Sequence, residues 1–263
     1  MPNTITKRYV DLPEGQLHVR EVAGCEPAIV FLHQTACSAQ SYDPLLAELA
    51  LPNRLLALDT PGFGGSFDPE GWPSLEDYAA WLLAALDALG AERFHLFGHH
   101  TGSGLAMLLA ARHPERVLSV MMAGAELMTP QERASFLDGL GEPLTPRADG
   151  SHLLENWNYA AHFNPGIDPE LIHGEVLAML RAWRARPQAY RAVAGCDTPA
   201  LAPLIQAPVL LVTSPDDYFH AELDRARALF PTAPVATTGG GNFQPTADPH
   251  GVARAIERFL ATL

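Results

Sequence analysis

Residues 94–104 read Phe94-His95-Leu96-Phe97-Gly98-His99-His100-Thr101-Gly102-Ser103-Gly104. A short apolar run followed by glycines and then by small and apolar residues predicts a strand, a tight turn and a helix. The glycines at 98 and 102 fit a helix that packs closely against a strand, because neither position then has room for a side chain. The turn places His100 beyond the end of the strand, where we expect its side chain to project.

The spacing of these glycines matches the nucleophile elbow Gly-x-Ser-x-Gly, in which a strained turn exposes the central side chain at the top of a sheet. His100 occupies the central position, where that motif carries its nucleophile. A serine acyl-enzyme at position 100 is therefore excluded. The elbow still predicts a strand-turn-helix unit, but its chemistry has to follow from a histidine.

Strands and helices alternate on both sides of the elbow. Apolar runs predict strands at 7–12, 16–23, 28–33, 54–58, 94–97, 117–122, 208–213 and 234–237. Helical periodicity is found at 40–49, 75–89, 103–112, 221–230 and 249–263. This alternation is typical of right-handed crossovers and a mostly parallel sheet.

The alternation stops between about 127 and 200, where helical segments at 130–140, 152–162 and 169–186 are separated by turns. We therefore expect an α/β core formed by residues 1–126 and 201–263, with residues 127–200 inserted as a helical lid. A length of 263 residues suits one such domain.

The composition narrows the choice of partners. The net charge of −13 makes nucleic acid and anionic membranes poor partners. The three cysteines, Cys25, Cys37 and Cys196, are too few and too widely spaced for a disulfide framework or a zinc knuckle. Neither a signal peptide nor a transmembrane run is evident, so we expect a cytoplasmic protein. The oligomeric state stays open.

Four sequence motifs follow one another along the chain. They are Phe31-Leu32-His33-Gln34, Asp59-Thr60-Pro61-Gly62-Phe63-Gly64-Gly65-Ser66, the elbow, and Leu210-Leu211-Val212-Thr213-Ser214-Pro215-Asp216-Asp217. With these motifs the chain resembles the α/β-hydrolase superfamily over nearly its whole length. The resemblance implies an α/β-hydrolase fold, a mostly parallel eight-stranded sheet with an inserted helical lid.

The resemblance also assigns positions in the site. It implies that Asp217 is the catalytic acid and that the backbone N–H groups of Gln34 and Thr101 form an oxyanion hole. The family histidine usually lies shortly before the last helix, where this chain has Gly240-Gly241-Asn242-Phe243. Asn242 therefore fills the place of that histidine, and His100 fills that of the nucleophile.

A histidine at the elbow is suited to general-base catalysis. It can activate a water or deprotonate a substrate while the oxyanion hole stabilises the negative charge that forms. Direct attack to give an acyl-imidazole is a second route. Asp217 and Glu126, which follows the 117–122 strand, compete as its carboxylate partner. A hydrogen-bonded, space-filling His100 in an inactive site is the structural alternative.

Other candidates carry two interpretations each. The lid residues His152, Trp157, Tyr159, His162 and Asn164 either pack a helix onto the core or contact substrate, and we select Trp157 and His162 as contacts. His33 is expected to organise its loop, and His99 to point away from the cavity. Cys37 and Ser38 lack an evident base. No ligand spacing indicates a metal, and no lysine follows the glycines at 239–241, so neither a metal nor a cofactor is expected.

These features predict an enzyme that acts on a small carbonyl-containing substrate by general-base catalysis from His100, through ester or lactone hydrolysis or through C–C cleavage. Decarboxylase-like lyase action and cofactor-free oxygen chemistry also occur in the family that the chain resembles. The alternative is a catalytically silent binder of small molecules that keeps the lidded pocket.

Overall fold

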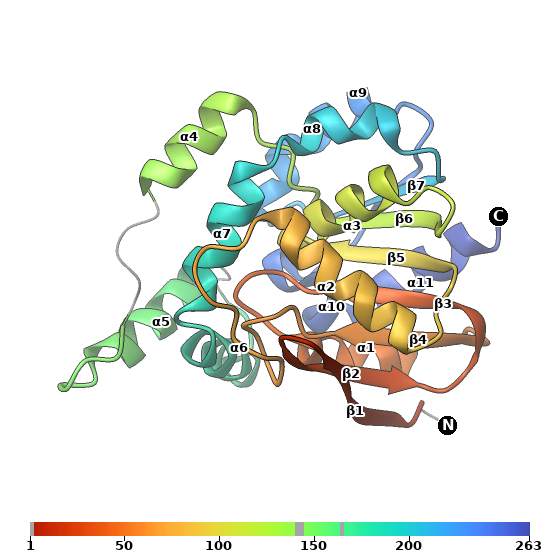
Figure 1. Cartoon of the computed structure of the whole chain (residues 1–263). Coiled ribbons are helices and arrows are strands. Elements are labelled where there is room, and N and C mark those ends of the chain that lie inside the picture. The colour runs from red at the N-terminus through yellow and green to blue at the C-terminus, as the bar shows by residue number, and fades with distance from the viewer. Residues whose placement is uncertain (1–2, 140–144, 164–165) are drawn as a thin grey trace.

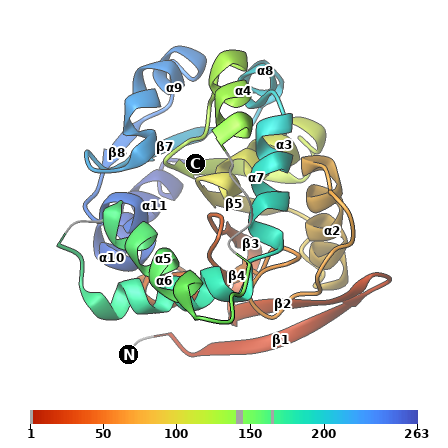
Figure 2. The same ribbon diagram turned by 90° about the vertical axis from the view of Figure 1, so that its left-hand side faces the viewer.

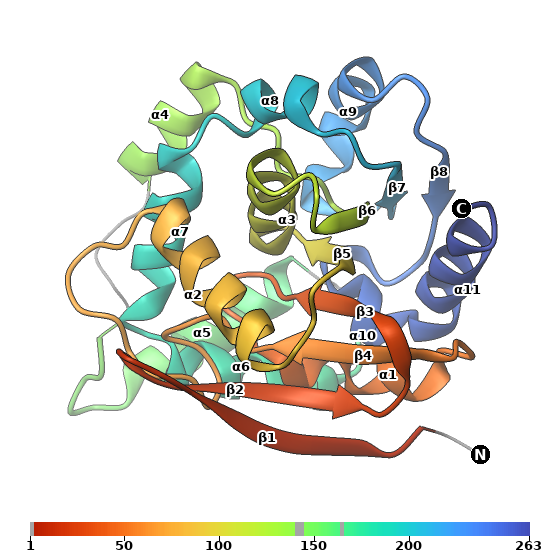
Figure 3. The ribbon, with the colours of Figure 1, turned by 45° about the vertical axis from the view of Figure 1, so that its right-hand side comes forward.

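The computed structural model describes residues 3–139, 145–163 and 166–263. One eight-stranded sheet, in the order β1-β2-β4-β3-β5-β6-β7-β8, forms its centre (Figures 1 and 3). The β1–β2 and β2–β4 pairs are antiparallel, and all the other pairs are parallel. The strands are β1 Ile5–Leu12, β2 Gly15–Val22, β3 Cys25–Leu32, β4 Asn53–Leu58, β5 Phe94–His99, β6 Val117–Ala123, β7 Val209–Thr213 and β8 Val235–Thr237. The predicted α/β-hydrolase fold is confirmed.

Helices cover both faces of the sheet, so the parallel strands are apolar along their length. Successive residues of β3 alternate between the two faces: Ile29 and Phe31 join one apolar cluster, and Val30 and Leu32 the other. The first cluster includes helices α1 and α11, and the second includes α2, α3 and α9. These helices are α1 Asp43–Glu48, α2 Leu75–Ala88, α3 Thr101–Arg112, α9 Leu223–Leu229 and α11 Pro249–Leu260.

In the part of the chain that the structure describes, five further α-helices lie between β6 and β7, and we call them the helical insertion. They are α4 Pro130–Gly139, α5 Ser151–His162, α6 Pro169–Arg181, α7 Ala185–Gly195 and α8 Thr198–Leu201. Figures 1 and 2 show α5, α6 and α7 gathered beside one end of the sheet. A third apolar cluster, containing Phe63, Ile172 and Met179, joins the insertion to the core. Among the described residues the insertion contains no strand.

The insertion departs from the sequence prediction at one point. The expected single helix over 169–186 is two helices, because α6 ends at Arg181 and α7 begins at Ala185. Pro187 lies in the first turn of α7, where a missing backbone N–H removes no intrahelical hydrogen bond. The proline therefore belongs to the start of a helix and does not end the preceding one.

None of the helices in the described part of the chain has the length and apolar character needed to cross a bilayer.

Candidate functional site

The elbow between β5 and α3 holds His100 in a strained conformation. Its φ of 49° and ψ of −114° make it the one non-glycine residue with positive φ among those described. Its backbone N–H donates to the carbonyl of Ala123 at 3.0 Å, which ties the turn to the end of β6. Such a conformation costs about 1–3 kcal/mol and persists only where the surrounding structure imposes it.

Both glycines of the motif are required by packing. A Cβ added at Gly98 would lie 2.3 Å from the carbonyl oxygen of Gly102, and one added at Gly102 would lie 2.0 Å from the carbonyl oxygen of Leu32. The helix therefore approaches β3 and β5 at backbone distance. This confirms the reason for small residues that the sequence indicated.

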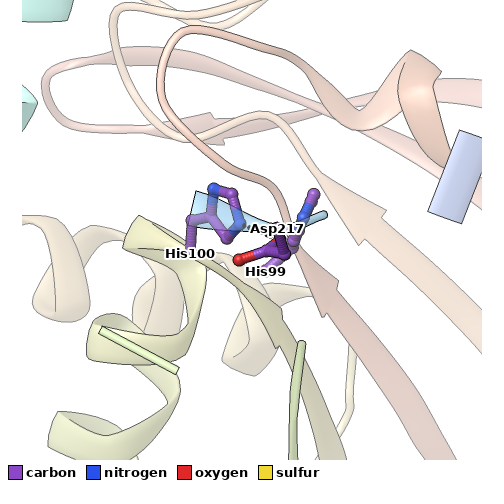
Figure 4. A group of neighbouring side chains, drawn as sticks. All are labelled: His99, His100 and Asp217. Atoms are coloured by element: carbon purple, nitrogen blue, oxygen red, sulfur yellow. Dashed lines mark hydrogen bonds and ion pairs between the residues drawn. The ribbon is translucent and has the colours of Figure 1, made fainter. Parts of the chain in front are cut away.

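The elbow directs His100 at a carboxylate. Its Nε2 lies 2.7 Å from Oδ2 of Asp217, and both side chains are buried (Figure 4). Asp217 follows β7 at the N-cap of the short 3₁₀ helix η3, Tyr218–Glu222. In this pair Nε2 donates, which leaves Nδ1 with the lone pair. Nδ1 forms no hydrogen bond with the described residues.

Three donors hold the Asp217 carboxylate. Besides His100, the backbone N–H of Phe219 donates to Oδ1 at 2.7 Å and Nε2 of Gln244 donates to Oδ2 at 2.9 Å. Burial by itself would raise the pKa of Asp217, but the charge and hydrogen bond of His100 bring that pKa below its ordinary value. The sequence gives no signal for Gln244, because a glutamine between Phe243 and Pro245 belongs to no motif.

Glu126 is not the partner of His100. Its Oε1 accepts a long hydrogen bond of 3.4 Å from the backbone N–H of Met128, and its Oε2 is buried without a partner. Burial raises the pKa of Glu126 to about 8. Of the two carboxylates it is therefore Asp217 that contacts the His100 ring, although it follows β7, two strands away from β5, whereas Glu126 follows the adjacent strand β6.

Asn242 lies where the resemblance places it, in the last loop of the fold. Its Oδ1 accepts from the backbone N–H of Tyr218 at 2.9 Å, and its Nδ2 donates to the carbonyl of Phe163 at 2.9 Å. Both groups of the amide are therefore engaged in joining η3 to the helical insertion.

The proposed oxyanion donors remain free. Neither the backbone N–H of Gln34 nor that of Thr101 donates a hydrogen bond to a described residue. His33 organises the first loop: its Nδ1 lies 2.7 Å from the carbonyl of Gln34, and its Nε2 accepts from the N–H of Thr60 at 3.0 Å. Burial lowers the pKa of His33, which keeps it in the neutral tautomer that this geometry requires.

A cavity of about 190 Å³ opens beside these groups. Gln34, His100, Thr101 and Asn242 line it from the core, together with Glu126. The insertion supplies much of the remaining wall, which is aromatic and aliphatic apart from Glu175 of α6. His100 therefore faces a pocket between the sheet and the helical insertion, at the carboxyl ends of the strands.

The structure corrects the prediction for Trp157 and His162. Neither lines the cavity: Trp157 packs partly buried against the apolar cluster of the insertion, and His162 is exposed. The face of α5 that meets the cavity carries Tyr159, Ala160 and, one turn later, Phe163. At 100° per residue, positions 157 and 162 fall on the flanks of that face. Asn164 lies outside the described residues.

His99 ends β5 beneath the site. It is buried, it does not line the cavity, and its ring centroid lies 4.3 Å from that of His100. Burial lowers the pKa of His99 well below its ordinary value. Within the described residues, His99, His100 and Asp217 form the one group whose metal-ligating atoms lie within 4.8 Å of one another. Because both oxygens of Asp217 already accept hydrogen bonds, the geometry is that of a hydrogen-bonded pair.

Displaced nucleophiles find no support in the geometry. Burial raises the pKa of the Cys37 thiol well above its ordinary value, and its Sγ donates to Oε1 of Glu175 at 3.3 Å. Ser38 caps a short 3₁₀ helix. The hydroxyl of Ser103 is fully buried and joins the carbonyl of His100 to the N–H of Glu126.

The doubly covered sheet and the elbow at the end of β5 define the hydrolase class of α/β folds. A family model described as alpha/beta hydrolase fold matches residues 27–146. The crystal structure of E-2-(acetamidomethylene)succinate hydrolase superposes with a TM-score of 0.78, covering 98% of this chain and 100% of that one at 24% identity. The chain therefore has the α/β-hydrolase fold, and its sequence is similar to that of members of the α/β-hydrolase superfamily.

The matches to related proteins differ in the share of each chain that they cover. It is 26% identical over 270 residues to 2-(acetamidomethylene)succinate hydrolase of Mesorhizobium japonicum, covering 96% of this chain and 94% of that protein. It is 34% identical over 146 residues to bifunctional epoxide hydrolase 2 of Rattus norvegicus, covering 52% of this chain and only 25% of that one. A fluoroacetate dehalogenase of a Burkholderia species is 31% identical over 119 residues, covering 43% of this chain and 39% of that one. These names support an enzyme of the α/β-hydrolase class.

Proposed function

We propose that the protein is a hydrolase of small esters or lactones in which His100 acts as the general base. The observation that carries this proposal is the 2.7 Å hydrogen bond from His100 Nε2 to Asp217, because it leaves Nδ1 unprotonated beside the cavity. A strained backbone that displays a titratable ring toward a cavity fits a functional role better than a packing role.

The reaction follows from these positions. Nδ1 of His100 takes a proton from a water molecule, and the resulting hydroxide attacks the carbonyl carbon of the substrate. The N–H groups of Gln34 and Thr101 stabilise the oxyanion that forms. When the intermediate collapses, the C–O bond to the leaving alkoxide breaks and His100 returns the proton to that oxygen. Ester and water thus give acid and alcohol, and no covalent enzyme intermediate forms.

Turnover of a panel of p-nitrophenyl esters and small lactones tests this role. We expect His100→Ala and His100→Gln to lose about 10²–10⁴-fold in kcat, because both remove the base. The matched control is His113→Ala, at the opposite end of α3 and partly exposed. The wild-type rate should fall on acidification, since only the neutral imidazole accepts a proton.

Two results would sink the proposal. One is full turnover in His100→Ala. The other is stoichiometric labelling of a serine by a fluorophosphonate, which needs an activated hydroxyl. A protein that binds small molecules but turns over none of the panel, with binding unchanged in His100→Ala, would instead be the catalytically silent binder.

A further inference from the structure

The ionisable groups that line the cavity are mainly acidic. Glu126 follows β6 and Glu175 lies on α6, so two carboxyl groups reach the wall from separate elements. Within the described residues no lysine or arginine lines the cavity. His100 is the one lining side chain that can carry a positive charge, and the Asp217 carboxylate already neutralises it.

The Glu126 carboxyl lacks part of the hydrogen bonding that a buried carboxyl group normally has. The residue is 1% exposed, and its Oε2 has no hydrogen-bond partner. A buried carboxyl oxygen without a partner costs free energy, and an apolar group of similar shape would avoid that cost. Neither the proposed base nor the oxyanion hole uses it. The Glu126 side chain lies against the cavity, and its Oε2 is buried just behind that wall, so the carboxyl is a group on which a bound cation can act.

Glu175 presents a second such carboxyl. The residue is 6% exposed, and its hydrogen bond within the described structure comes from the thiol of Cys37, a weak donor. Burial raises the pKa of Glu175 to about 7. No cation among the described residues is paired with Glu175, so its negative charge would have no counter-charge within them.

Aromatic rings complete the wall. Tyr159, Phe163, Tyr218 and Phe219 form a chain of edge-to-face contacts, with centroids 5.0, 6.2 and 5.1 Å apart, that ends at the ring of His100. The guanidinium of Arg186 lies 4.3 Å from the centroid of the Tyr159 ring, and Arg186 is not one of the residues that line the cavity. Rings of this kind attract cations through their faces.

We propose that this cavity binds substrates that carry an ammonium group on an apolar skeleton, with Glu126 and Glu175 as its counter-charges, and that it rejects carboxylates. A cation gains an ion pair with a buried carboxylate and contacts with aromatic faces. Above about pH 8, where both acids are ionised, a carboxylate would instead be buried beside two negative charges with no basic side chain to pair it. The volume of about 190 Å³ accommodates one aromatic ring with a short polar chain.

Ionisation of Glu126 accompanies the binding of the cation. The charged groups acting on this carboxyl are Glu222, which raises its pKa, and Arg133, which lowers it; burial outweighs both. Glu175 on α6 is the second carboxyl group that would face the bound ammonium group. Binding of an ammonium group should therefore release protons, and its affinity should rise as the pH increases toward about 8.

Calorimetric titration at about pH 8.5, where both acids are ionised, tests the proposal with three matched probes: 2-phenylethylammonium, 2-phenylethanol and 3-phenylpropanoate. We expect the ammonium probe to bind about tenfold or more tightly than the alcohol, and the carboxylate to give no measurable binding. Glu126→Gln and the double variant with Glu175→Gln should erase the preference for the cation while leaving the alcohol bound. Glu70→Gln, at an exposed surface site, is the control.

The proposal fails if the carboxylate binds as tightly as the ammonium probe, if the ammonium probe does not bind at millimolar concentration, or if its preference survives in the double variant. Far-ultraviolet circular dichroism and the urea midpoint establish that each variant is folded. The proposal builds on the proposed function, but the titrations report binding without turnover. Loss of the cation preference and loss of catalysis are therefore separate results.

Discussion

The two nitrogens of the His100 ring lie in different environments. Nε2 is bound to a buried carboxylate at 2.7 Å, whereas Nδ1 forms no hydrogen bond with the described residues. The carboxylate accepts from Nε2 and so holds the proton on that nitrogen, which keeps Nδ1 basic. Asp217 is thus a positioning residue in the proposed mechanism, and Gln244 and Phe219 fix its carboxylate in turn.

Asp217→Asn tests this assignment of the two nitrogens. An amide NH₂ at position 217 can donate to Nε2, which would move the ring proton to Nδ1 and block the base. We expect kcat to fall about 10²–10⁴-fold with little change in KM. The control is Asp216→Asn, the same change at the exposed neighbouring position. An unchanged kcat in Asp217→Asn would show that the carboxylate does not select the tautomer.

At the scale of elements, the elbow and the loop after β6 form one packed unit. Gly124 follows β6 with a φ of 58°. A Cβ added there would lie 2.4 Å from His100 Cδ2 and 2.9 Å from Asp217 Oδ1. Because Gly124 has no side chain, His100 after β5 and Asp217 after β7 can come into contact beside the end of β6.

Gly124→Ala should separate the two side chains. We expect a loss of stability of about 1–3 kcal/mol from the backbone conformation, together with a loss of turnover larger than the unfolded fraction explains. Urea unfolding and kcat measured on the same samples distinguish the two effects. Gly174→Ala is the control, because a Cβ there meets nothing within 4 Å and lies in helix α6. Wild-type kcat in folded Gly124→Ala would contradict this account.

The elements of the sheet were predictable because the strands are short apolar runs with a glycine or proline near their ends. The insertion was less so: the pattern over 169–186 continued past a real helix end at Arg181, and α7 was missed although Tyr190 and Val193 on it line the cavity. A helix of the insertion can have apolar residues both toward the core and toward the cavity. The sequence alone does not distinguish these two faces.

The site was predictable where a motif fixes the backbone. His100, Asp217, Gln34, Thr101 and Asn242 lie together because strand order and turn geometry bring them to one end of the sheet. Side-chain direction was not predictable for Trp157, nor for Gln244, which depends on three-dimensional packing of two loops. The unpartnered oxygen of Glu126 has no sequence signal at all, because burial and hydrogen bonding are properties of the folded chain.

For the whole molecule, buried carboxyl groups make stability depend on pH in opposite directions. The folded-state pKa of Asp217 is lowered, so its contribution to stability is present above its unfolded value and is lost as the pH falls through the folded value. The pKa of Glu126 is raised from 4.5 to about 8, so its contribution is present below pH 4.5 and is lost as the pH rises through about 8. Glu175, with a pKa of about 7, acts in the same direction as Glu126.

Glu126→Gln should therefore remove part of the loss of stability at alkaline pH. The glutamine stays neutral, so above pH 8 it is spared the cost of a buried charge without a partner. We expect the variant to exceed the wild type in free energy of unfolding by a few kcal/mol at about pH 9, with little difference at about pH 4.5. Urea unfolding across this range measures the difference, with Glu70→Gln as the exposed control. Parallel curves for wild type and Glu126→Gln would mean that Glu126 is already ionised and hydrated in the folded protein, and the binding of a cation would then release no proton from it.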